Sequence, residues 1–261
     1  CSLIRSLYTV FVGGERMTFN ITAYWQLLRV KHYIKNGFVL LPVFFAAKFT
    51  EQDIWLSVGL AFFAFCLAAS GIYILNDYKD LEDDKKHPTK SKRPLAAGTV
   101  SVGHAFVMLS VCWVLALACA WLVNPKVLLA ISVYIALNIA YSGGLKHQAI
   151  IDVACVAMGF VIRLWAGAKA AEVWLSEWLV LMTFLLCVLI ALGKRRDDLM
   201  LLEKTGKKMR AALDGYNLTF INSAMVLMTA VVVVFYALYT LSPTALNRSA
   251  HSHHLYLTTI L

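Results

Sequence analysis

The chain has 261 residues, of which 60% are hydrophobic and only 15% charged, with a net charge of +9 at pH 7 and a mean hydropathy of +0.70. Soluble domains contain about 45–50% apolar residues, so this composition excludes an ordinary soluble domain and indicates a membrane protein. The positive excess is confined to short stretches, none of which belongs to a soluble nucleic-acid-binding fold, and we expect no nucleic-acid partner.

Long apolar stretches predict an all-α membrane protein built as a multi-span helical bundle. A helix needs roughly 20 residues to cross the bilayer. Stretches that approach this length lie near residues 36–50, 54–75, 104–123, 127–142, 149–171, 178–193 and 219–241. An eighth span is expected to begin near Leu255. We expect residues 1–16 to be an N-terminal extension of uncertain origin, and residues 17–261 to be a transmembrane domain that is cut short at its C-terminal end.

The connections between these stretches alternate in charge. Basic residues are concentrated before the first expected span and in the connections around residues 79–93, 146–147 and 194–210, whereas the connections in between are poor in Lys and Arg. Cytoplasmic loops of membrane proteins carry the excess of Lys and Arg. The pattern therefore places the N-terminus and the basic connections in the cytoplasm, together with any chemistry that they perform.

The stretch "GIYILNDYKDLEDDKKHPTKSKRPLAAG", residues 71–98, concentrates charges of both signs at the end of the second expected span. If that helix continues, Asp77, Asp80 and Asp84 lie on nearly one face, with Asn76 beside them. Converging carboxylates need a compensating cation, and hard oxygen ligands suit Mg²⁺, which shares its coordination with substrate phosphates. The stretch predicts a site for a metal-bridged diphosphate. The competing interpretation is a solvated charged loop.

The segment "NDYKDLEDD" resembles the NDxxDxxxD motif of the UbiA superfamily of intramembrane prenyltransferases. The resemblance covers essentially the whole chain. It implies a helical bundle, typically of nine spans, with a metal–diphosphate site in a cavity open to the cytoplasm. Members usually carry a second acidic DxxxD motif after the sixth span. Here the corresponding segment is "ALGKRRDDLMLLEK", in which Asp197 and Asp198 are adjacent and basic residues precede them.

Basic residues at that position suit a substrate with an additional phosphate, because Lys and Arg bind phosphate oxygens directly. The pattern is similar to the decaprenyl-phosphate phosphoribosyltransferase branch, as are "LLRVKHYIKNGFVLLPVFFA", "KKHPTKSKRPLAAG", "AYSGGLKHQAIIDV" and "IRLWAGAKA". The resemblance implies Mg²⁺-dependent transfer of 5-phosphoribosyl from phosphoribosyl pyrophosphate to a polyprenyl phosphate, in the inner (cytoplasmic) membrane of a bacterium. In mycobacteria it implies a role in cell-wall precursor synthesis.

Two acidic substrates at one site require surrounding cations and polar groups. The expected substrate-binding residues are Lys35, Asn36, Tyr73, Lys85, Lys90, Arg93, Tyr141, Lys146, Arg163, Lys194 and Arg195. Lys194 and Arg195 are assigned to the ribose 5-phosphate, and Lys35, Lys146 and Arg163 to the lipid phosphate. Arg163 lies inside the fifth expected span, where a charge is costly and indicates function. The alternative for Arg163 is an internal pair with Asp152.

Two other functions are weighed against this one. An ordinary UbiA prenyltransferase would move a prenyl group from a prenyl diphosphate to an aromatic or lipid acceptor, and the missing DxxxD spacing disfavours it. A transporter or channel would show internal repeats or broken helices with polar residues at the midplane. No repeat is evident, and the charges cluster at one interface. The sequence leaves open whether the protein forms a homo-oligomer.

Overall fold

The computed structural model describes residues 7–12, 15–48, 50–87, 89–205, 213 and 215–242, with side chains from Ile21 onward. The chain divides into two compact units: the first comprises Cys1–Ala136 and Ala166–Val173, and the second comprises Leu137–Trp165 and Trp174–Leu261. The division falls within helices α6 (Pro125–Gly143) and α7 (Ile151–Ala170), so each of these helices contributes to both units.

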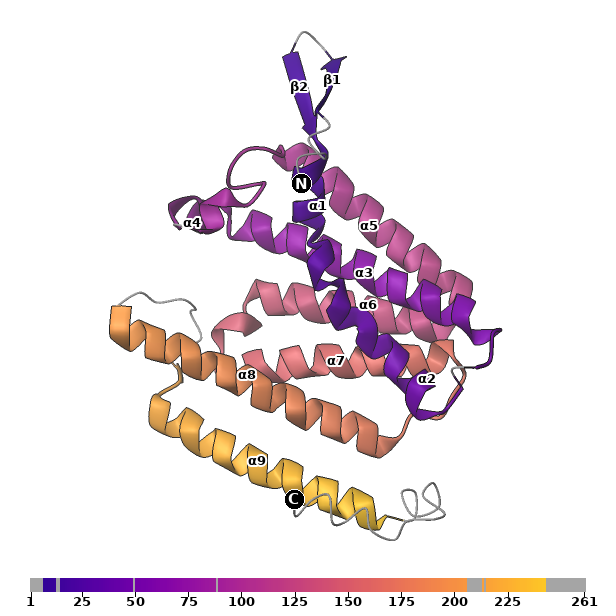
Figure 1. Cartoon of the computed structure of the whole chain (residues 1–261). Coiled ribbons are helices and arrows are strands. Elements are labelled where there is room, and N and C mark those ends of the chain that lie inside the picture. The colour runs from indigo at the N-terminus through magenta and orange to yellow at the C-terminus, as the bar shows by residue number, and fades with distance from the viewer. Residues whose placement is uncertain are drawn as a thin grey trace, which may run out of the picture. The chain divides into compact units, whose positions relative to one another are not determined.

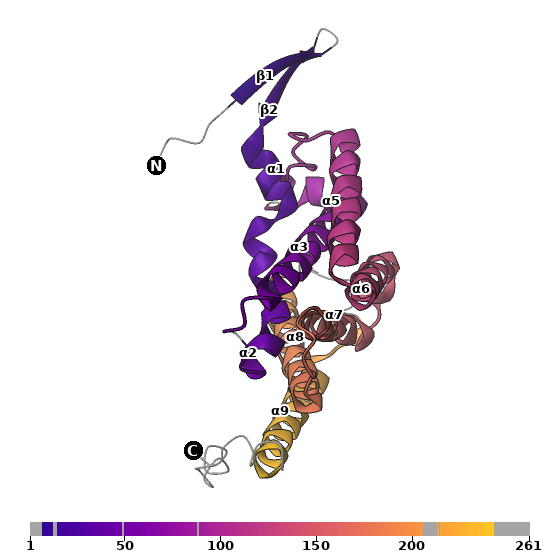
Figure 2. The same cartoon turned by 90° about the vertical axis from the view of Figure 1, so that its right-hand side faces the viewer.

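The first unit begins with a two-stranded antiparallel hairpin, β1 (Leu7–Val12) and β2 (Glu15–Asn20). In its register Leu7 faces Asn20, and Val12 faces Glu15. Helix α1 (Ile21–Leu28) follows β2 directly, as Figure 2 shows. The hairpin therefore ends at Asn20, and the boundary expected after residue 16 falls inside β2.

The first expected span, residues 36–50, is wrong as a single long helix. The chain there forms the 3₁₀ helix η1 (Val30–Leu40) and the short helix α2 (Leu41–Phe45), which cross α3 in Figure 1. Arg29 has a φ of 52° and separates α1 from η1, while Ala47, with a φ of 56°, follows the end of α2. Left-handed backbone at non-glycine residues interrupts regular helix, so hydropathy alone overestimated the length of this element.

Helices α3 (Ile54–Lys79) and α5 (Val102–Val123) pack along each other in the first unit. Small residues on α3 let the two backbones approach closely. At Gly71 the contact is so tight that an added Cβ would collide with the indole of Trp113. The short elements α4 (Leu81–Lys86) and η2 (Lys90–Lys92) connect α3 to α5. The side chain of Ser101 accepts a hydrogen bond from the backbone N–H of His104 and begins α5.

The second unit contains η3 (Leu145–His147), most of α7, α8 (Glu177–Thr205) and α9 (Leu218–Leu241). Helices α8 and α9 lie side by side (Figure 1). Their shared core contains buried side chains from α7, α8, α9 and the segment before α9, namely Val153, Ala191, Leu192, Leu199, Leu213, Tyr216 and Ile221. Asn217 caps α9 by accepting a hydrogen bond from the N–H of Phe220 at 2.7 Å.

Six helices among the described residues are long and apolar enough to cross a membrane: α3, α5, α6, α7, α8 and α9. They match six of the seven predicted spans, while the expected eighth span lies outside the described residues. Helix α8 continues through residues 194–205, which were expected to form a loop. This segment is rich in Lys, Arg and Leu, which favour helix, although its charged residues make it too polar for the bilayer core. Lys194 and Asp198 are therefore one helical turn apart.

Candidate functional site

The acidic stretch lies at a helix break in the first unit. Asn76 and Asp77 are in the last turns of α3, and Asp84 is in α4. Asp80 stands between the two helices, with φ −93° and ψ 8°. The prediction of one continuous helical face is therefore wrong at Asp80. Asp77 and Asp84, which lie on either side of the break along the chain, nevertheless share one neighbour.

That neighbour is Arg93, and a second arginine joins it. Asp77 Oδ1 accepts hydrogen bonds from Arg29 Nη2 at 2.5 Å and from Arg93 Nη1 at 3.1 Å. The same Nη1 of Arg93 lies 2.6 Å from Asp84 Oδ2. Both aspartates are only 2% exposed. We call Arg29, Asp77, Asp84 and Arg93 the arginine–aspartate cluster. Burying two carboxylates is costly unless they are paired, and the arginines provide that pairing.

The donor groups of this stretch fit a hard divalent cation by their chemistry, since carboxylate and amide oxygens are the ligands that Mg²⁺ takes. In the structure, however, these carboxylates do not converge as ligands around a metal ion would. Among the residues that the structure describes, no three His, Cys, Asp or Glu side chains lie close enough together to hold a metal ion. The predicted convergence of Asp77, Asp80 and Asp84 is thus replaced by two aspartates joined through Arg93.

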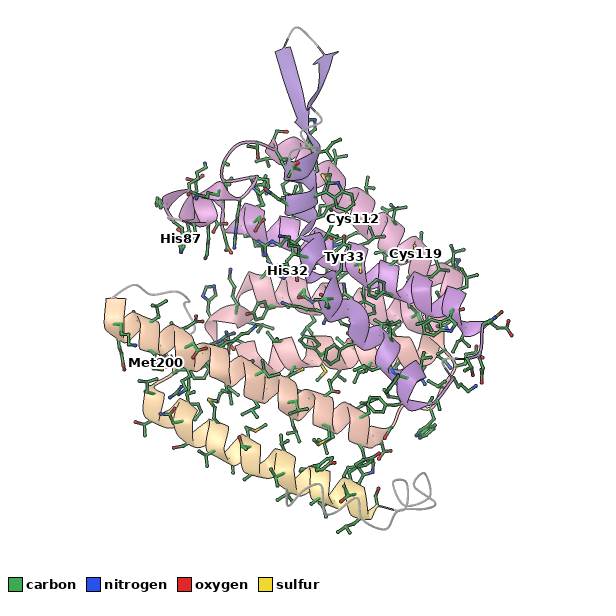
Figure 3. The ribbon with its side chains drawn as sticks, in the orientation of Figure 1. His32, Tyr33, His87, Cys112, Cys119 and Met200 are labelled. Carbon is green, nitrogen blue, oxygen red and sulfur yellow. The ribbon has the colours of Figure 1, made fainter. Side chains whose placement is uncertain are left out.

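Arg29 belongs to this cluster but is not among the predicted site residues, because its position before the first expected span indicates only the membrane topology. Its guanidinium carbon lies 4.9 Å from the centre of the Tyr73 ring. His32, labelled in Figure 3, has its ring 5.6 Å from the same tyrosine. Partial desolvation, reinforced by the charges of Lys35 and Arg29, lowers the pKa of His32.

A pocket of about 490 Å³ opens beside this group at the junction of α1 and η1. It is lined by Thr22, Trp25, Gln26, Arg29, Val30, Lys31 and His32. Arg29, Lys31 and His32 make part of this lining basic, and Arg29 also pairs with the buried carboxylate of Asp77.

The other predicted residues of the first unit divide into exposed and buried positions. Lys35 is exposed. Lys85 is also exposed and pairs with Glu82 at 2.8 Å. The backbone N–H of half-buried Lys90 donates to His87 Nδ1 at 3.3 Å. Asn36 is 1% exposed, and its amide donates to Cys66 Sγ at 3.3 Å, so it packs η1 against α3.

In the second unit the predicted phosphate ligand Arg195 lies in a buried ion pair. Its Nε donates to Asp152 Oδ2 at 2.6 Å, and the two residues are 3% and 1% exposed. Asp152 also accepts a hydrogen bond from the hydroxyl of Tyr216 at 2.7 Å. The alternative prediction, in which Arg163 pairs with Asp152, is therefore wrong, because Arg195 and Tyr216 are the partners of this acid. Tyr216 was not predicted, because no motif marks it.

The remaining predicted residues of this unit are one buried arginine and three more accessible side chains. Arg163 is 6% exposed, donates to the carbonyl of Gly159 at 3.0 Å and lies 5.0 Å from the ring centre of Phe160. Tyr141 and Lys146 are half-buried, and Lys194 is exposed on α8. Within each unit, the structure thus brings together Asp77, Asp84 and Arg93 in one, and Arg195 with Asp152 and Tyr216 in the other.

Several curated relatives of this chain are described as decaprenyl-phosphate phosphoribosyltransferases. The chain is 38% identical to a decaprenyl-phosphate phosphoribosyltransferase of Mycolicibacterium smegmatis over 221 residues, covering 83% of this chain and 70% of the relative. It is 40% identical to a protein of the same name from Corynebacterium glutamicum over 219 residues, covering 82% of this chain and 66% of the relative.

The fold has solved counterparts. A UbiA homologue from Archaeoglobus fulgidus, solved bound to DMAPP and Mg²⁺, superposes with a TM-score of 0.71 at 20% identity and covers 91% of this chain and 84% of that chain. At this identity the likeness shows the fold alone. The model of the UbiA prenyltransferase family matches residues 36–250. The chain therefore belongs to the UbiA prenyltransferase family.

Proposed function

We propose that this protein transfers a 5-phosphoribosyl group from phosphoribosyl pyrophosphate to a polyprenyl phosphate of the decaprenyl type, in a Mg²⁺-dependent reaction that releases pyrophosphate. The observation that carries the proposal is the basic segment on α8, where Lys194 stands one turn before Asp198 in place of the first acid of a DxxxD pair. The names of the relatives from M. smegmatis and C. glutamicum support the acceptor.

The acidic stretch of the first unit would hold the cation and, through it, the pyrophosphate. We assign Asn76, Asp77, Asp80 and Asp84 as its ligands. Bound Mg²⁺ would neutralise the charge that develops on the leaving pyrophosphate. Because Arg93 now lies between Asp77 and Asp84, their participation as ligands requires the guanidinium to move away from at least one carboxylate. A displaced guanidinium is itself a good phosphate ligand.

The basic residues complete the recognition of a substrate pair that carries many negative charges. We assign Lys194 to the ribose 5-phosphate, because it is exposed on α8. Lys35, Lys146 and Arg163 are assigned to the acceptor phosphate, while Tyr73, Lys85, Lys90 and Tyr141 are assigned to the surroundings of the substrates. Arg195 is tied to Asp152 through Nε, so only its terminal nitrogens are proposed for phosphate contact.

The reaction needs no general base from the protein. The bond between the anomeric carbon and the pyrophosphate oxygen breaks, and the electron pair leaves with pyrophosphate. A phosphate oxygen of the lipid, already anionic at neutral pH, forms the new bond to that carbon. Catalysis then rests on positioning and on charge stabilisation by the surrounding side chains.

We further propose a location in the cytoplasmic membrane of a bacterium, with the acidic stretch facing the cytoplasm. The support is the concentration of Lys and Arg in the segments that flank the ends of α3, α6 and α8, since cytoplasmic segments carry this excess. Phosphoribosyl pyrophosphate, being a soluble polyanion, would reach the site from that side.

The test is incubation of membranes containing the protein with labelled phosphoribosyl pyrophosphate, Mg²⁺ and decaprenyl phosphate. We expect label in the lipid fraction, and loss of that label when Mg²⁺ is removed with EDTA. A parallel reaction with a labelled prenyl diphosphate and 4-hydroxybenzoate tests ordinary prenyl transfer. Label in the second product but not in the first would overturn the proposal.

A further inference from the structure

Ile150 has a backbone conformation that is rare for its residue type. Its φ is +70°, in the left-handed region, immediately before α7 begins at Ile151. A β-branched residue is strained there, because its Cβ crowds the backbone. Such strain persists only where the surrounding structure enforces it, and it tends to mark functional positions. Ile150 ends the short connection, residues 144–150, that contains Lys146.

A buried chain of hydrogen bonds enforces this conformation from within the second unit. The N–H of Ile150 donates to the hydroxyl oxygen of Tyr216 at 2.6 Å. That hydroxyl donates to Asp152 Oδ1 at 2.7 Å, and Asp152 Oδ2 accepts from Arg195 Nε at 2.6 Å. Burial raises the pKa of Tyr216 to about 12, so the hydroxyl keeps the proton that it donates.

These four residues join four parts of the second unit. Ile150 belongs to the connection between α6 and α7, Asp152 to the first turn of α7, Arg195 to α8, and Tyr216 to the segment before α9. Ile150 takes part through its backbone and is 61% exposed, whereas the three residues that take part through their side chains are nearly inaccessible, at 1% for Asp152, 3% for Arg195 and 6% for Tyr216. Solvent therefore cannot replace a member of the series when it is removed.

We propose that Tyr216 is a positioning residue, which holds the connection 144–150 in its strained form and thereby places Lys146 for the phosphate of the lipid acceptor. This inference rests on the proposed function, in which Lys146 contacts that phosphate. Tyr216 acts through the backbone of Ile150 and touches no substrate.

A purely stabilising role explains the arrangement less well. A buried ion pair is often no more stabilising than apolar side chains of the same volume. A glycine at position 150 would supply the left-handed conformation without strain. Because a tyrosine hydroxyl holds Ile150 in this conformation, the connection 144–150 has one enforced geometry. Such a geometry suits a loop whose lysine must contact a phosphate at a fixed place.

The first test compares Tyr216→Phe with Tyr239→Phe, which makes the same change on α9, where the ring lies beside Trp178. In the phosphoribosyl transfer assay we expect Tyr216→Phe to raise the KM for decaprenyl phosphate about tenfold, with the KM for phosphoribosyl pyrophosphate changed less than about twofold. Tyr239→Phe should leave both constants unchanged. An equal change in both KM values would overturn the inference. So would unchanged KM values with a fall in kcat that matches the fraction of the variant that is unfolded.

The second test is rescue by Ile150→Gly. Glycine adopts the left-handed conformation without a restraining hydroxyl, so the double variant Tyr216→Phe/Ile150→Gly should recover most of the lost affinity for decaprenyl phosphate. It also relieves the strain if Tyr216→Phe alone folds poorly. No recovery in a folded double variant contradicts the role given to Ile150.

A third measurement separates this inference from the proposed function. Hydrogen–deuterium exchange of residues 144–150 needs no substrate, and Tyr216→Phe should make it faster than in the Tyr239→Phe protein. Unchanged exchange overturns the positioning role whatever the activity. If the wild-type protein transfers no phosphoribosyl group, the proposed reaction is refuted. If exchange in residues 144–150 is still faster in Tyr216→Phe, the inference that Tyr216 restrains this connection remains supported.

Discussion

Arg93 Nη1 lies 2.6 Å from Asp84 Oδ2, and the same nitrogen lies 3.1 Å from Asp77 Oδ1, so one guanidinium joins two carboxylates on opposite sides of the helix break at Asp80. The sequence places the acidic and basic parts of residues 71–98 next to each other, and the structure shows them paired. The basic part therefore stabilises the acidic part in addition to any role in binding phosphates.

Arg93→Met should destabilise the protein, because it leaves two buried carboxylates with less compensation. Removing one partner of a buried ion pair costs about 3–5 kcal/mol. We expect a value near the lower end, since Arg29 still pairs with Asp77. The measurement is thermal unfolding of the purified protein in detergent. Lys92→Met is the matched control on the exposed neighbour, and an equal fall in Tm for both variants would contradict the pairing.

Asp77→Asn should reduce phosphoribosyl transfer by at least about 100-fold, the loss typical when one preorganised electrostatic group is removed from an active site. The amide has nearly the same shape but loses the charge that a cation requires. The control is Asp83→Asn on the exposed side of α4. Both variants should insert into membranes in normal amounts, and wild-type turnover in Asp77→Asn would refute the metal assignment.

Lys194→Asp should impair the use of phosphoribosyl pyrophosphate, because it places a carboxylate one helical turn before Asp198, where a phosphate is proposed to bind. We expect the KM for phosphoribosyl pyrophosphate to rise by about 10–100-fold, which corresponds to the loss of one charge-assisted phosphate contact and added repulsion. Initial rates at varied donor concentration measure it. Lys204→Asp makes the same change near the end of α8 and should have little effect; equal effects would remove Lys194 from the site.

Gly167→Ala should destabilise the first unit strongly, because a Cβ at this position in α7 would collide with the backbone carbonyl of Val39 in η1. Backbone atoms cannot move aside as a flexible side chain can, and overpacking costs about 1–3 kcal/mol or more. Gly59→Ala in α3 is the control, because nothing lies within 4 Å of its added Cβ, and it should be neutral or slightly stabilising. Equal Tm values for the two variants would contradict the close approach of α7 to η1.

Six membrane-spanning helices could be predicted from the sequence because hydropathy is a local property: a run of apolar residues is recognisable without knowing its neighbours. The acidic stretch could be found in the same way, since the spacing of Asp77, Asp80 and Asp84 is written in consecutive residues. The length of α8 beyond Gly193 and the interruption at Arg29 could not, because there polar helix formers and a left-handed residue oppose what hydropathy indicates.

By itself the sequence determined that this is a multi-span membrane protein with a concentrated acidic site and a basic segment in place of a second acidic motif. The tertiary structure alone decided which charges pair. Arg29 is 48 residues from Asp77 along the chain, and Arg195 is 43 residues from Asp152. Any of 24 basic side chains could have balanced those acids. The choice follows from which helices the fold packs together, since a buried charge must be met by the partner that reaches it away from water.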